Sequence, residues 1–406
     1  MGEPKKHLLT LGSFFPANRI IPKELFLLGN ALGRTGPVCM GANNTPAARM
    51  LLRGAAAGVA AAGSRVTVHS LPSPIQGSWA LRKNQATHGL FLESKGRDSL
   101  RLWIMDRWGL LVGEQELQAL KQRLQTEELY KVRDGEVGTL AGTPLAQEQW
   151  AAEITREASL PHPMLRRLTV AVEGPSPANQ ALAQALRSLD CQVEGAWRPG
   201  IPCFSARWGG FALQARDEQG ALLSPDQLLA LEVLLEMEHG QGRVTVPGDA
   251  TAAVDLVAAG YNGQVERLTG EEKDPALARY AAQPWLWAAP SAAVRICARL
   301  RTSGQRLDTL ISKTPRFCRH SREVPFPTGQ AQAAVLLAGD HFLPLAGGGA
   351  RLRKSSGWVS LIPRSAALQV TVEGPDLELS GELCDWYAHR AAVLSQALEE
   401  NSRGKK

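Results

Sequence analysis

The sequence predicts an α/β protein of three similar α/β/α units, each with a mixed sheet, followed by a smaller α+β unit. A chain of 406 residues is long enough for two to four domains, each with a core of its own. Through most of the chain, short apolar runs alternate with longer helical segments, a pattern typical of βαβ connections. After Arg322 the composition changes to strands joined by short turns, which favours an antiparallel sheet.

The first unit contains four apolar runs that we expect to be buried strands: Val38–Met40, Val66–Val68, Gly89–Leu92 and Leu100–Met105. A segment rich in Ala, Leu and Gly, Pro46–Ala62, separates the first two and predicts a crossover helix. Ligands bind parallel sheets at the carboxyl ends of the strands, which makes three loops the candidate binding region. These loops are Gly41–Thr45, Leu71–Ile75 and Glu93–Ser99.

The second and third units repeat the pattern with different turns. Strand Arg167–Val172 precedes helix Gln180–Leu189, and Gly210–Arg216 is expected to form a hairpin with Ala221–Leu223 across the turn DEQG. Ser224 caps a long amphipathic helix. The third unit is predicted from its strands and helices, which are Arg243–Val246, Ala250–Ala259, Gln264–Leu268 and a helix from about Ser291 to Thr302.

The last unit is predicted to be an antiparallel sheet and a long helix. Its expected elements are strand Glu323–Phe326, helix Ala331–Leu337, strands Gly357–Ile362 and Leu368–Glu373, and helix Leu379–Leu398. The domain boundaries that follow are 1–144, 145–240, 241–322 and 323–406.

Composition excludes several classes of protein. No apolar run is long enough to cross a bilayer, and the first residues lack the apolar core of a signal peptide. Six scattered cysteines without ligand spacing favour reduced thiols in a cytoplasmic protein and give no zinc site. The net charge of +6 is concentrated in the basic run Arg295–Arg322, which is either an anion-binding surface or a solvated helix face. Aromatic residues do not alternate with these charges, so nucleic acid is not an expected partner.

Several segments in a fixed order resemble the α-D-phosphohexomutase superfamily of phosphomannomutases and phosphoglucomutases. V-C-M-G-A-N-N-T from position 38 and A-A-G-S-R-V-T-V-H-S-L-P-S-P from position 61 are similar to the family's "VVVGRDTR … GxxVxxxGxxPTP". S-G-W-V-S-L-I-P-R-S from position 356, followed by V-T-V-E-G, is similar to "GWxLxRPSGTEP … VYxEA". The resemblance covers nearly the whole chain and implies the family's four-domain fold.

The resemblance also assigns the family's catalytic loops to positions of this chain, and those loops are degenerate. The phosphoserine loop "TASHNP" corresponds to the segment with Ser94 and Lys95, where Lys95 stands at the serine position. The metal loop "DGDADR", whose three aspartates hold Mg²⁺, corresponds to Arg207, Gly209 and Phe211. A hard cation needs several oxygen ligands, and none of these three side chains supplies one.

Two further family loops are altered in different ways. The phosphate clamp "RPSGTEP" becomes Ile362-Pro363-Arg364-Ser365-Ala366-Ala367, where Arg364 and Ser365 keep anion-binding capacity. The sugar-reading "GExSG" loop has no counterpart between Leu268 and Ser291. The triplet Trp285-Leu286-Trp287 lies there, either as a platform for a sugar or, as we favour, as a buried anchor.

The stretch Leu307–Pro325 resembles the linker of degenerate mutase-like modules that are fused to sugar-nucleotidyltransferases. The chain is therefore interpreted as a mutase-like pseudoenzyme without catalytic residues or cofactor, which binds a sugar phosphate or a partner enzyme of carbohydrate metabolism. The alternative is an active phosphosugar mutase with a rearranged site that uses Ser94 or Lys95, and Mg²⁺ is expected only in that case. A scaffold whose cleft is filled by side chains is the third hypothesis.

Overall fold

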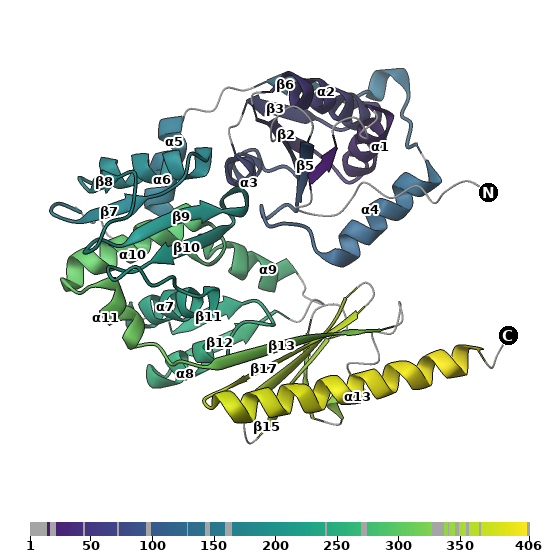
Figure 1. Cartoon of the computed structure of the whole chain (residues 1–406). Coiled ribbons are helices and arrows are strands. Elements are labelled where there is room, and N and C mark those ends of the chain that lie inside the picture. The colour runs from purple at the N-terminus through teal and green to yellow at the C-terminus, as the bar shows by residue number, and fades with distance from the viewer. Residues whose placement is uncertain are drawn as a thin grey trace. The chain divides into compact units, whose positions relative to one another are not determined.

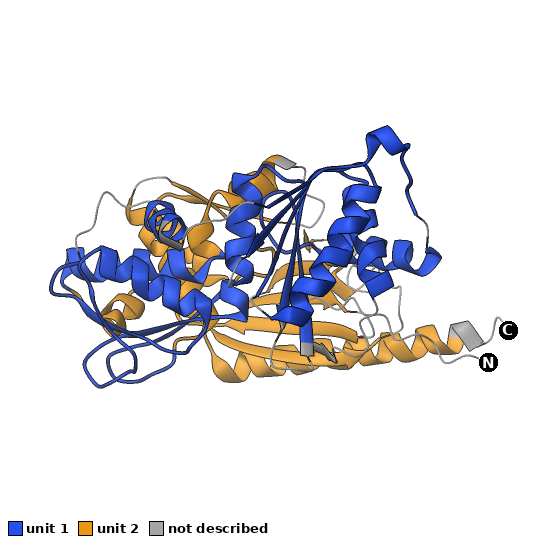
Figure 2. Cartoon of the chain, turned by 90° about the horizontal axis from the view of Figure 1, so that it is seen from above, with its two compact units in different colours: residues 1–222, 287–304 blue, residues 223–286, 305–406 orange. Residues whose placement is uncertain are grey.

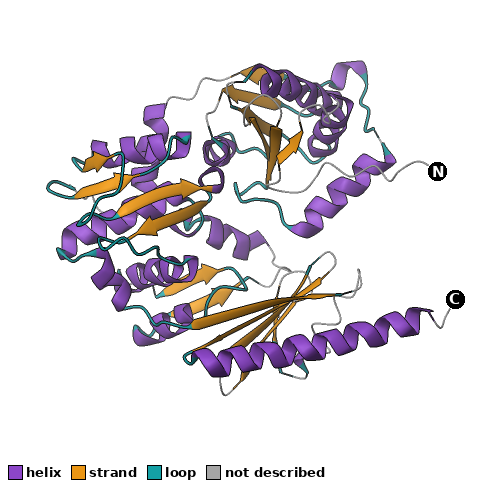
Figure 3. Ribbon diagram, viewed as in Figure 1, coloured by secondary structure: helices purple, strands orange, loops and turns teal. Residues whose placement is uncertain are grey.

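The computed structural model describes residues 14–16, 22–43, 45–70, 73–94, 99–127, 129–142, 147–158, 165–239, 242–268, 274–326, 337–339, 341–345, 349–354, 357–364 and 367–403. The chain divides into two compact units (Figures 1 and 2). Unit 1 comprises residues 1–222 and 287–304, and unit 2 comprises residues 223–286 and 305–406. In both units helices flank the strands (Figure 3).

Unit 1 contains two sheets and the helices that cover them. Its elements are β1 (Phe14–Pro16), α1 (Pro22–Gly33), β2 (Val38–Ala42), α2 (Pro46–Ala61), β3 (Val66–Ser70), α3 (Pro74–Lys83), β4 (His88–Ser94), β5 (Ser99–Met105), α4 (Glu114–Thr126), η2 (Asp134–Glu136), β6 (Leu140–Gly142), α5 (Gln147–Glu157), β7 (Thr169–Val172), α6 (Pro177–Ser188), β8 (Gln192–Glu194), β9 (Cys203–Arg207), η3 (Trp208–Gly210), β10 (Ala212–Arg216) and α10 (Ala289–Ser303).

The first sheet of unit 1 has the strand order β1-β5-β4-β2-β3-β6 and is covered on both faces. Strands β2, β3 and β4 are parallel, as the sequence predicts, while β5 runs antiparallel to β4. Alternate residues enter different cores, because successive side chains of a strand point to opposite faces. Leu90 and Leu92 pack with helices α1 and α2, whereas Phe91 and Trp103 pack in the core on the α3 side.

The second sheet of unit 1 corrects one expectation. Its strand order is β10-β9-β7-β8, and β9 and β10 form an antiparallel hairpin across η3. The sequence predicts a different hairpin across the turn DEQG, but there only Arg216 and Leu222 form an isolated bridge. Strand β9 was not predicted, because the Pro- and Gly-rich residues directly before it indicate a loop and give no signal for the start of a strand.

Unit 2 contains a two-stranded parallel sheet of β11 and β12 and a five-stranded antiparallel sheet in the order β13-β17-β16-β15-β14. Its elements are α7 (Pro225–Glu238), β11 (Arg243–Val246), α8 (Ala253–Gly260), β12 (Gln264–Arg267), α9 (Asp274–Ala281), η4 (Pro284–Leu286), α11 (Leu307–Ser312), β13 (Cys318–Pro325), β14 (Leu343–Leu345), β15 (Gly349–Lys354), β16 (Gly357–Pro363), β17 (Ala367–Gly374) and α13 (Leu377–Arg403).

The long helix α13 lies along β13 and β17 and covers one face of the five-stranded sheet (Figure 1). Val359, Leu361 and Val370 of the sheet pack against Tyr387 and Ala391 of this helix. Strand β13 begins earlier than expected, and α13 is longer at both ends. Most of the expected helix 331–337 lies outside the described residues.

The predicted fold class is confirmed: mixed α/β sheets are followed by an antiparallel sheet with its helix. The four domain boundaries stay a prediction. Among the described residues, no helix combines the length and the apolar character that crossing a membrane requires.

Candidate functional site

The three positions that the resemblance assigns to the metal loop lie at the tight turn of the β9–β10 hairpin. Trp208, Gly209 and Gly210 all have positive φ angles, of 49°, 68° and 101°. A left-handed backbone suits glycine and is strained for a bulky residue such as tryptophan. Three such residues in a row make this turn unusually constrained, so its shape requires the two glycines.

Arg207 occupies the first of these positions, and its guanidinium contacts the neighbouring strand of the same hairpin. Its Nε atom donates a hydrogen bond of 2.7 Å to Oε1 of Gln214 on the neighbouring strand β10. The side chain is exposed to solvent. A guanidinium donates hydrogen bonds and accepts none, so Arg207 has no oxygen or lone pair to offer a cation.

Gly209 and Gly210 are pressed against the beginning of helix α3. A Cβ atom on Gly209 would lie 2.8 Å from Cγ of Pro74 and 3.1 Å from Cζ2 of Trp103. On Gly210 it would lie 2.4 Å from Cγ2 of Ile75. These distances are shorter than carbon atoms tolerate, which leaves no space at either position for a carboxylate side chain.

Phe211 belongs to what we call the aromatic cluster, which consists of Trp103, Trp208, Phe211 and Trp287. The ring centroid of Trp103 lies 5.5 Å from that of Trp208 and 5.9 Å from that of Phe211. Phe211 in turn lies 6.4 Å from Trp287 in a stacked arrangement. Such centroid distances are typical of favourable aromatic pairs. The third metal-loop position is therefore part of an apolar contact.

The aromatic cluster reaches the strand that leads into the assigned nucleophile loop. Trp103 is fully buried and donates its Nε1 hydrogen to Oε2 of Glu93 at 3.0 Å, which satisfies the indole. The guanidinium of Arg101 stacks on the same ring at 5.2 Å from its centroid. Ser94 follows Glu93 as the last residue of β4 and pairs with Leu100 of β5. Lys95 lies outside the described residues.

These residues do not fit a magnesium ion. Mg²⁺ requires an octahedral shell of oxygen atoms with at least one or two carboxylates. The three assigned positions provide a guanidinium, a glycine without space and a phenyl ring. In the part of the chain that the structure describes, no group of three or more His, Cys, Asp or Glu side chains has an arrangement that could hold a metal ion.

Arg364, the predicted anion-binding residue, lies at the turn between β16 and β17 in unit 2. Its backbone N–H donates to the carbonyl of Ala367 at 2.7 Å, which closes the turn. The exposed guanidinium donates from Nε and Nη2 to Oε1 of Gln369, at 3.0 and 2.6 Å. This amide is a neutral partner, so a phosphate could displace it. Ser365 lies outside the described residues, and its assignment stays a prediction.

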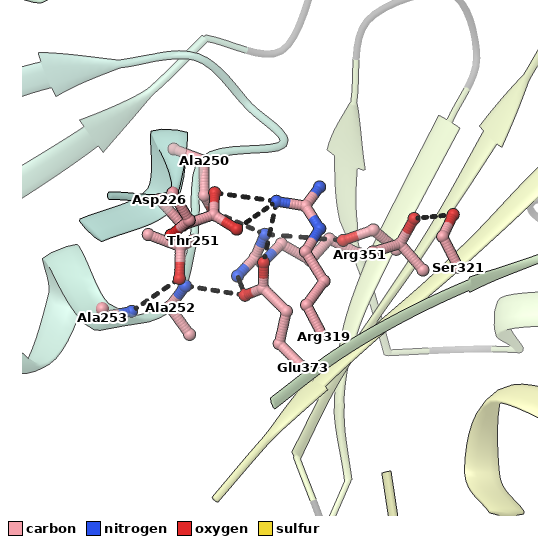
Figure 4. Close-up of polar contacts among 12 residues, drawn as sticks. Asp226, Ala250, Thr251, Ala252, Ala253, Arg319, Ser321, Arg351 and Glu373 are labelled. Atoms are coloured by element: carbon pink, nitrogen blue, oxygen red, sulfur yellow. Dashed lines mark hydrogen bonds and ion pairs between the residues drawn. The ribbon is translucent and has the colours of Figure 1, made fainter. Parts of the chain in front are cut away.

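The second charged site of unit 2, which we call the ion cluster, consists of Asp226, Arg319, Arg351 and Glu373 (Figure 4). Arg351 and Glu373 are almost completely buried, at 1% and 3% exposure, with 3.4 Å between Nη2 and Oε2. Nη1 of Arg319 lies 2.8 Å from Oδ1 of Asp226 and 3.4 Å from Oε1 of Glu373. Two positive and two negative side chains therefore neutralise one another.

The ion cluster ties the loop after β11 to the five-stranded sheet. Glu373 Oε2 accepts the backbone N–H of Ala252 at 2.8 Å, and Nη1 of Arg351 donates to the carbonyl of Ala250 at 2.8 Å (Figure 4). Burial lowers the pKa of Arg351 to about 10. Burial likewise raises the pKa of Glu373 above its ordinary value, although the N–H of Ala252 and the charge of Arg351 oppose this shift. Both groups carry the cost of desolvation.

The sequence did not predict the ion cluster, because its members come from separate elements without motif spacing. A weaker signal was present in the alternation of the strands. Leu352 on β15 and Val372 on β17 face helix α13, so their neighbours Arg351 and Glu373 must face the other side of the sheet. Charged residues on the sheet face opposite α13 indicate that polar groups cover this face, and here these are the backbone groups of Ala250 and Ala252.

The basic run Arg295–Arg322 is partly engaged in contacts within the fold. Arg295 is buried at 2% exposure, Arg306 pairs with Asp308, and Arg322 pairs with Asp385 at 3.0 Å. Arg319 belongs to the ion cluster. Three of the eight basic residues of this run therefore form ion pairs that the structure describes, and a fourth is buried, which disfavours a continuous anion-binding surface. Trp285 and Trp287 are also buried, as the anchor interpretation predicts.

Comparison with solved structures reveals which fold this is. A phosphoglucomutase/phosphomannomutase family protein from Burkholderia thailandensis matches with a TM-score of 0.71 at 13% identity, over 93% of this chain and 94% of that chain. The chain has the phosphohexomutase fold. A putative phosphomannomutase from Thermus thermophilus matches with a TM-score of 0.64 at 15% identity, over 97% of this chain and 99% of that one.

A more distant phosphohexomutase-fold structure shows what one such protein binds. The N-acetylphosphoglucosamine mutase of Aspergillus fumigatus, in complex with GlcNAc-6P and magnesium, matches with a TM-score of 0.52 at 8% identity, over 95% of this chain and 94% of that chain. No protein-family model and no curated protein matches the sequence. The phosphohexomutase fold is therefore found in this chain at the level of structure, with very few identical residues.

Proposed function

We propose that this phosphohexomutase-fold protein is a pseudoenzyme that binds a sugar phosphate, in the cytoplasm, within carbohydrate metabolism. The observation that supports the proposal is the aromatic cluster at the assigned metal-loop positions. Magnesium-assisted phosphoryl transfer depends on positioning and on neutralising the charge of the transferred group. Arg207, Gly209 and Phe211 supply no oxygen ligand for the metal, since these positions hold a hydrogen-bonded guanidinium, a glycine without space for a side chain and a stacked ring.

The proposed ligand contact is Arg364, at the position that corresponds to the family's phosphate clamp. An arginine can bind phosphate through two parallel hydrogen bonds, and Arg364 is exposed with only the neutral Gln369 as its described side-chain partner. Ser365 would add a hydroxyl donor. The structural neighbour from Aspergillus was solved with a sugar phosphate, which makes this ligand class the first to test.

The test is isothermal calorimetry of the full chain with the 1- and 6-phosphates of glucose and mannose, each with and without Mg²⁺. We expect binding that does not require the metal and that weakens about tenfold or more in the Arg364→Ala variant, because a charge-assisted contact to phosphate is lost. The control is Arg166→Ala, an exposed arginine that pairs with Asp190 in unit 1. Its affinity should equal that of the unchanged protein.

The same experiment distinguishes the alternatives. Binding that requires Mg²⁺, together with turnover in a coupled mutase assay that is lost in Ser94→Ala or Lys95→Ala, would establish an active mutase with a rearranged site. Absence of binding to all four sugar phosphates would contradict the ligand proposal. The function would then be contact with a partner enzyme of sugar-nucleotide metabolism, or a structural role.

A further inference from the structure

The outward face of helix α13 carries a row of exposed apolar side chains. Leu379, Trp386 and Val393 are 51%, 50% and 52% exposed. They follow one another at heptad spacing, so that they lie along one line of the helix surface. The opposite face of the same helix is buried against the five-stranded sheet, where Cys384, Tyr387 and Ala391 are nearly inaccessible. The row is therefore separate from the core of unit 2.

One acidic and one basic residue flank the central tryptophan of this row. Glu382 lies about one helical turn before Trp386, and Arg390 lies one turn after it, and both are exposed. The guanidinium of Arg390 lies 4.7 Å from the ring centroid of Trp386, so this charge extends along the row and not away from it. The helix therefore presents an acid on one side of a central tryptophan and a base on the other.

This arrangement is complementary to itself when two helices run antiparallel. We propose that α13 pairs with α13 of a second copy of this chain, about a twofold axis at Trp386. In such an isologous contact each residue before Trp386 faces its counterpart after it. Leu379 then faces Val393 and Glu382 faces Arg390, each twice. Parallel pairing would oppose Glu382 to Glu382 and Arg390 to Arg390, which is unfavourable.

The proposed interface has the composition of a protein contact but a small size. Tryptophan and arginine are the residues that most often dominate binding energy, and here they lie at its centre. One pair of helices buries less area than a standard interface of about 1,600 Å². The dimer is therefore weak and depends on protein concentration. The contact is independent of any ligand at Arg364, and it goes beyond the proposed function.

The test is sedimentation velocity of the full chain over a series of concentrations, with charge-swapped variants. Glu382→Arg alone and Arg390→Glu alone each place like charges together twice, and we expect each to weaken the dimer about tenfold. The double variant Glu382→Arg/Arg390→Glu restores opposite charges and should regain most of the affinity. Arg123→Glu on α4, an exposed charge change elsewhere, is the control and should have no effect.

Each outcome decides the proposal. A chain that stays monomeric at every concentration overturns it, as does a dimer that is indifferent to both single swaps. Weakening by the single swaps without recovery in the double variant overturns the antiparallel register. Trp386→Ala provides an independent measurement, since loss of the central contact should abolish association. Because all the altered residues are exposed, circular dichroism should show an unchanged fold.

Discussion

The aromatic cluster of unit 1 and the ion cluster of unit 2 are both buried contacts, but they differ in the chemistry of their side chains. Trp103, Phe211 and Trp287 meet through uncharged rings, whereas Arg351 and Glu373 bring full charges into an almost inaccessible site. Burial of the rings and their mutual orientation stabilise the folded state. Burial of a charge removes its favourable hydration, and only interactions with its partners offset that cost. In this chain, aromatic contacts lie at the positions that the resemblance assigns to a metal. The buried charges of unit 2 connect the loop after β11 to the five-stranded sheet.

Substitutions in the two clusters should therefore differ in their cost to stability. Loss of one member of the ion cluster leaves its partner charged and buried, while loss of one ring leaves only a smaller apolar surface. The two clusters are also expected to respond differently to pH, because the aromatic rings do not titrate whereas Glu373 does. Unfolding of a two-unit chain need not be a single transition, so each variant is best compared through a probe near its own site.

The largest effect is expected from Arg351→Met. The substitution leaves the Glu373 carboxylate with only Arg319 at 3.4 Å and the N–H of Ala252, at a site that is almost inaccessible to solvent. Removing one partner of a buried ion pair costs about 3 kcal/mol or more. Urea unfolding followed by circular dichroism measures this change. The Arg351 guanidinium also lies 5.0 Å from the ring centroid of Trp358.

Two further variants sharpen that measurement. Arg353→Met removes an exposed arginine of the same strand, 5.9 Å from the same ring, and should change the free energy of unfolding by less than about 1 kcal/mol. The double variant Arg351→Met/Glu373→Leu removes both charges and should recover most of the loss. A double variant as unstable as Arg351→Met would contradict the view that the uncompensated carboxylate is the cause.

The next effect concerns the turn of the aromatic cluster. Gly209→Ala introduces a Cβ at a φ of 68°, only 2.8 Å from Pro74, so the backbone and α3 must move. We expect the free energy of unfolding to fall by about 2 kcal/mol, from strain and displaced packing. Chemical denaturation monitored by tryptophan emission measures it. Gly195→Ala, where a Cβ would meet no atom within 4 Å, should be close to neutral, and an equal loss there would refute the explanation.

The pH dependence separates the two clusters. The pKa of Glu373 is raised above its usual value of 4.5, mainly by burial, so the folded protein binds more protons than the unfolded chain above that pH. The contribution of Glu373 to the free energy of unfolding therefore falls as pH rises through this window. Relative to the unchanged protein, Glu373→Gln should gain stability with rising pH, as thermal unfolding at several pH values would measure.

The aromatic cluster provides the matched control for pH. The stability difference between Phe211→Leu and the unchanged protein should be the same at every pH, because neither side chain titrates. If Phe211→Leu showed the same pH dependence as Glu373→Gln, the slope would have to arise elsewhere in the chain.

The smallest effect is expected from Arg207→Asp, which restores one carboxylate to the assigned metal loop. Arg207 is exposed and loses only its hydrogen bond to Gln214, so stability should change by about 0.5 kcal/mol or less. Millimolar Mg²⁺ should not raise the unfolding temperature of this variant, because one carboxylate beside Gly209 and Phe211 does not form a site. A rise that depends on magnesium would contradict the proposed pseudoenzyme.

Many of the strands and helices, although not β9, could be predicted from the sequence, since apolar runs and caps are local signals. Thr45, Ser176 and Ser224 cap the helices that follow them, each accepting a backbone N–H with its side chain. That Arg207, Gly209 and Phe211 carry no carboxylate was also visible without coordinates, because metal chemistry depends on residue type. The length of α13 was underestimated, since the few residues at each end of a helix add little periodic signal.

The contacts at the assigned metal-loop positions and the partners of the basic residues became known from the tertiary structure alone. Strand β9 and its pairing with β10 arise from long-range contacts, so the strained turn at Trp208 was not predictable from local pattern. The basic run around Arg319 could equally have been a free surface, and its partners Asp226 and Glu373 come from distant elements. Residue type sets which chemistry is possible, but burial and partners are properties of packing, and packing joins residues that sequence spacing does not relate.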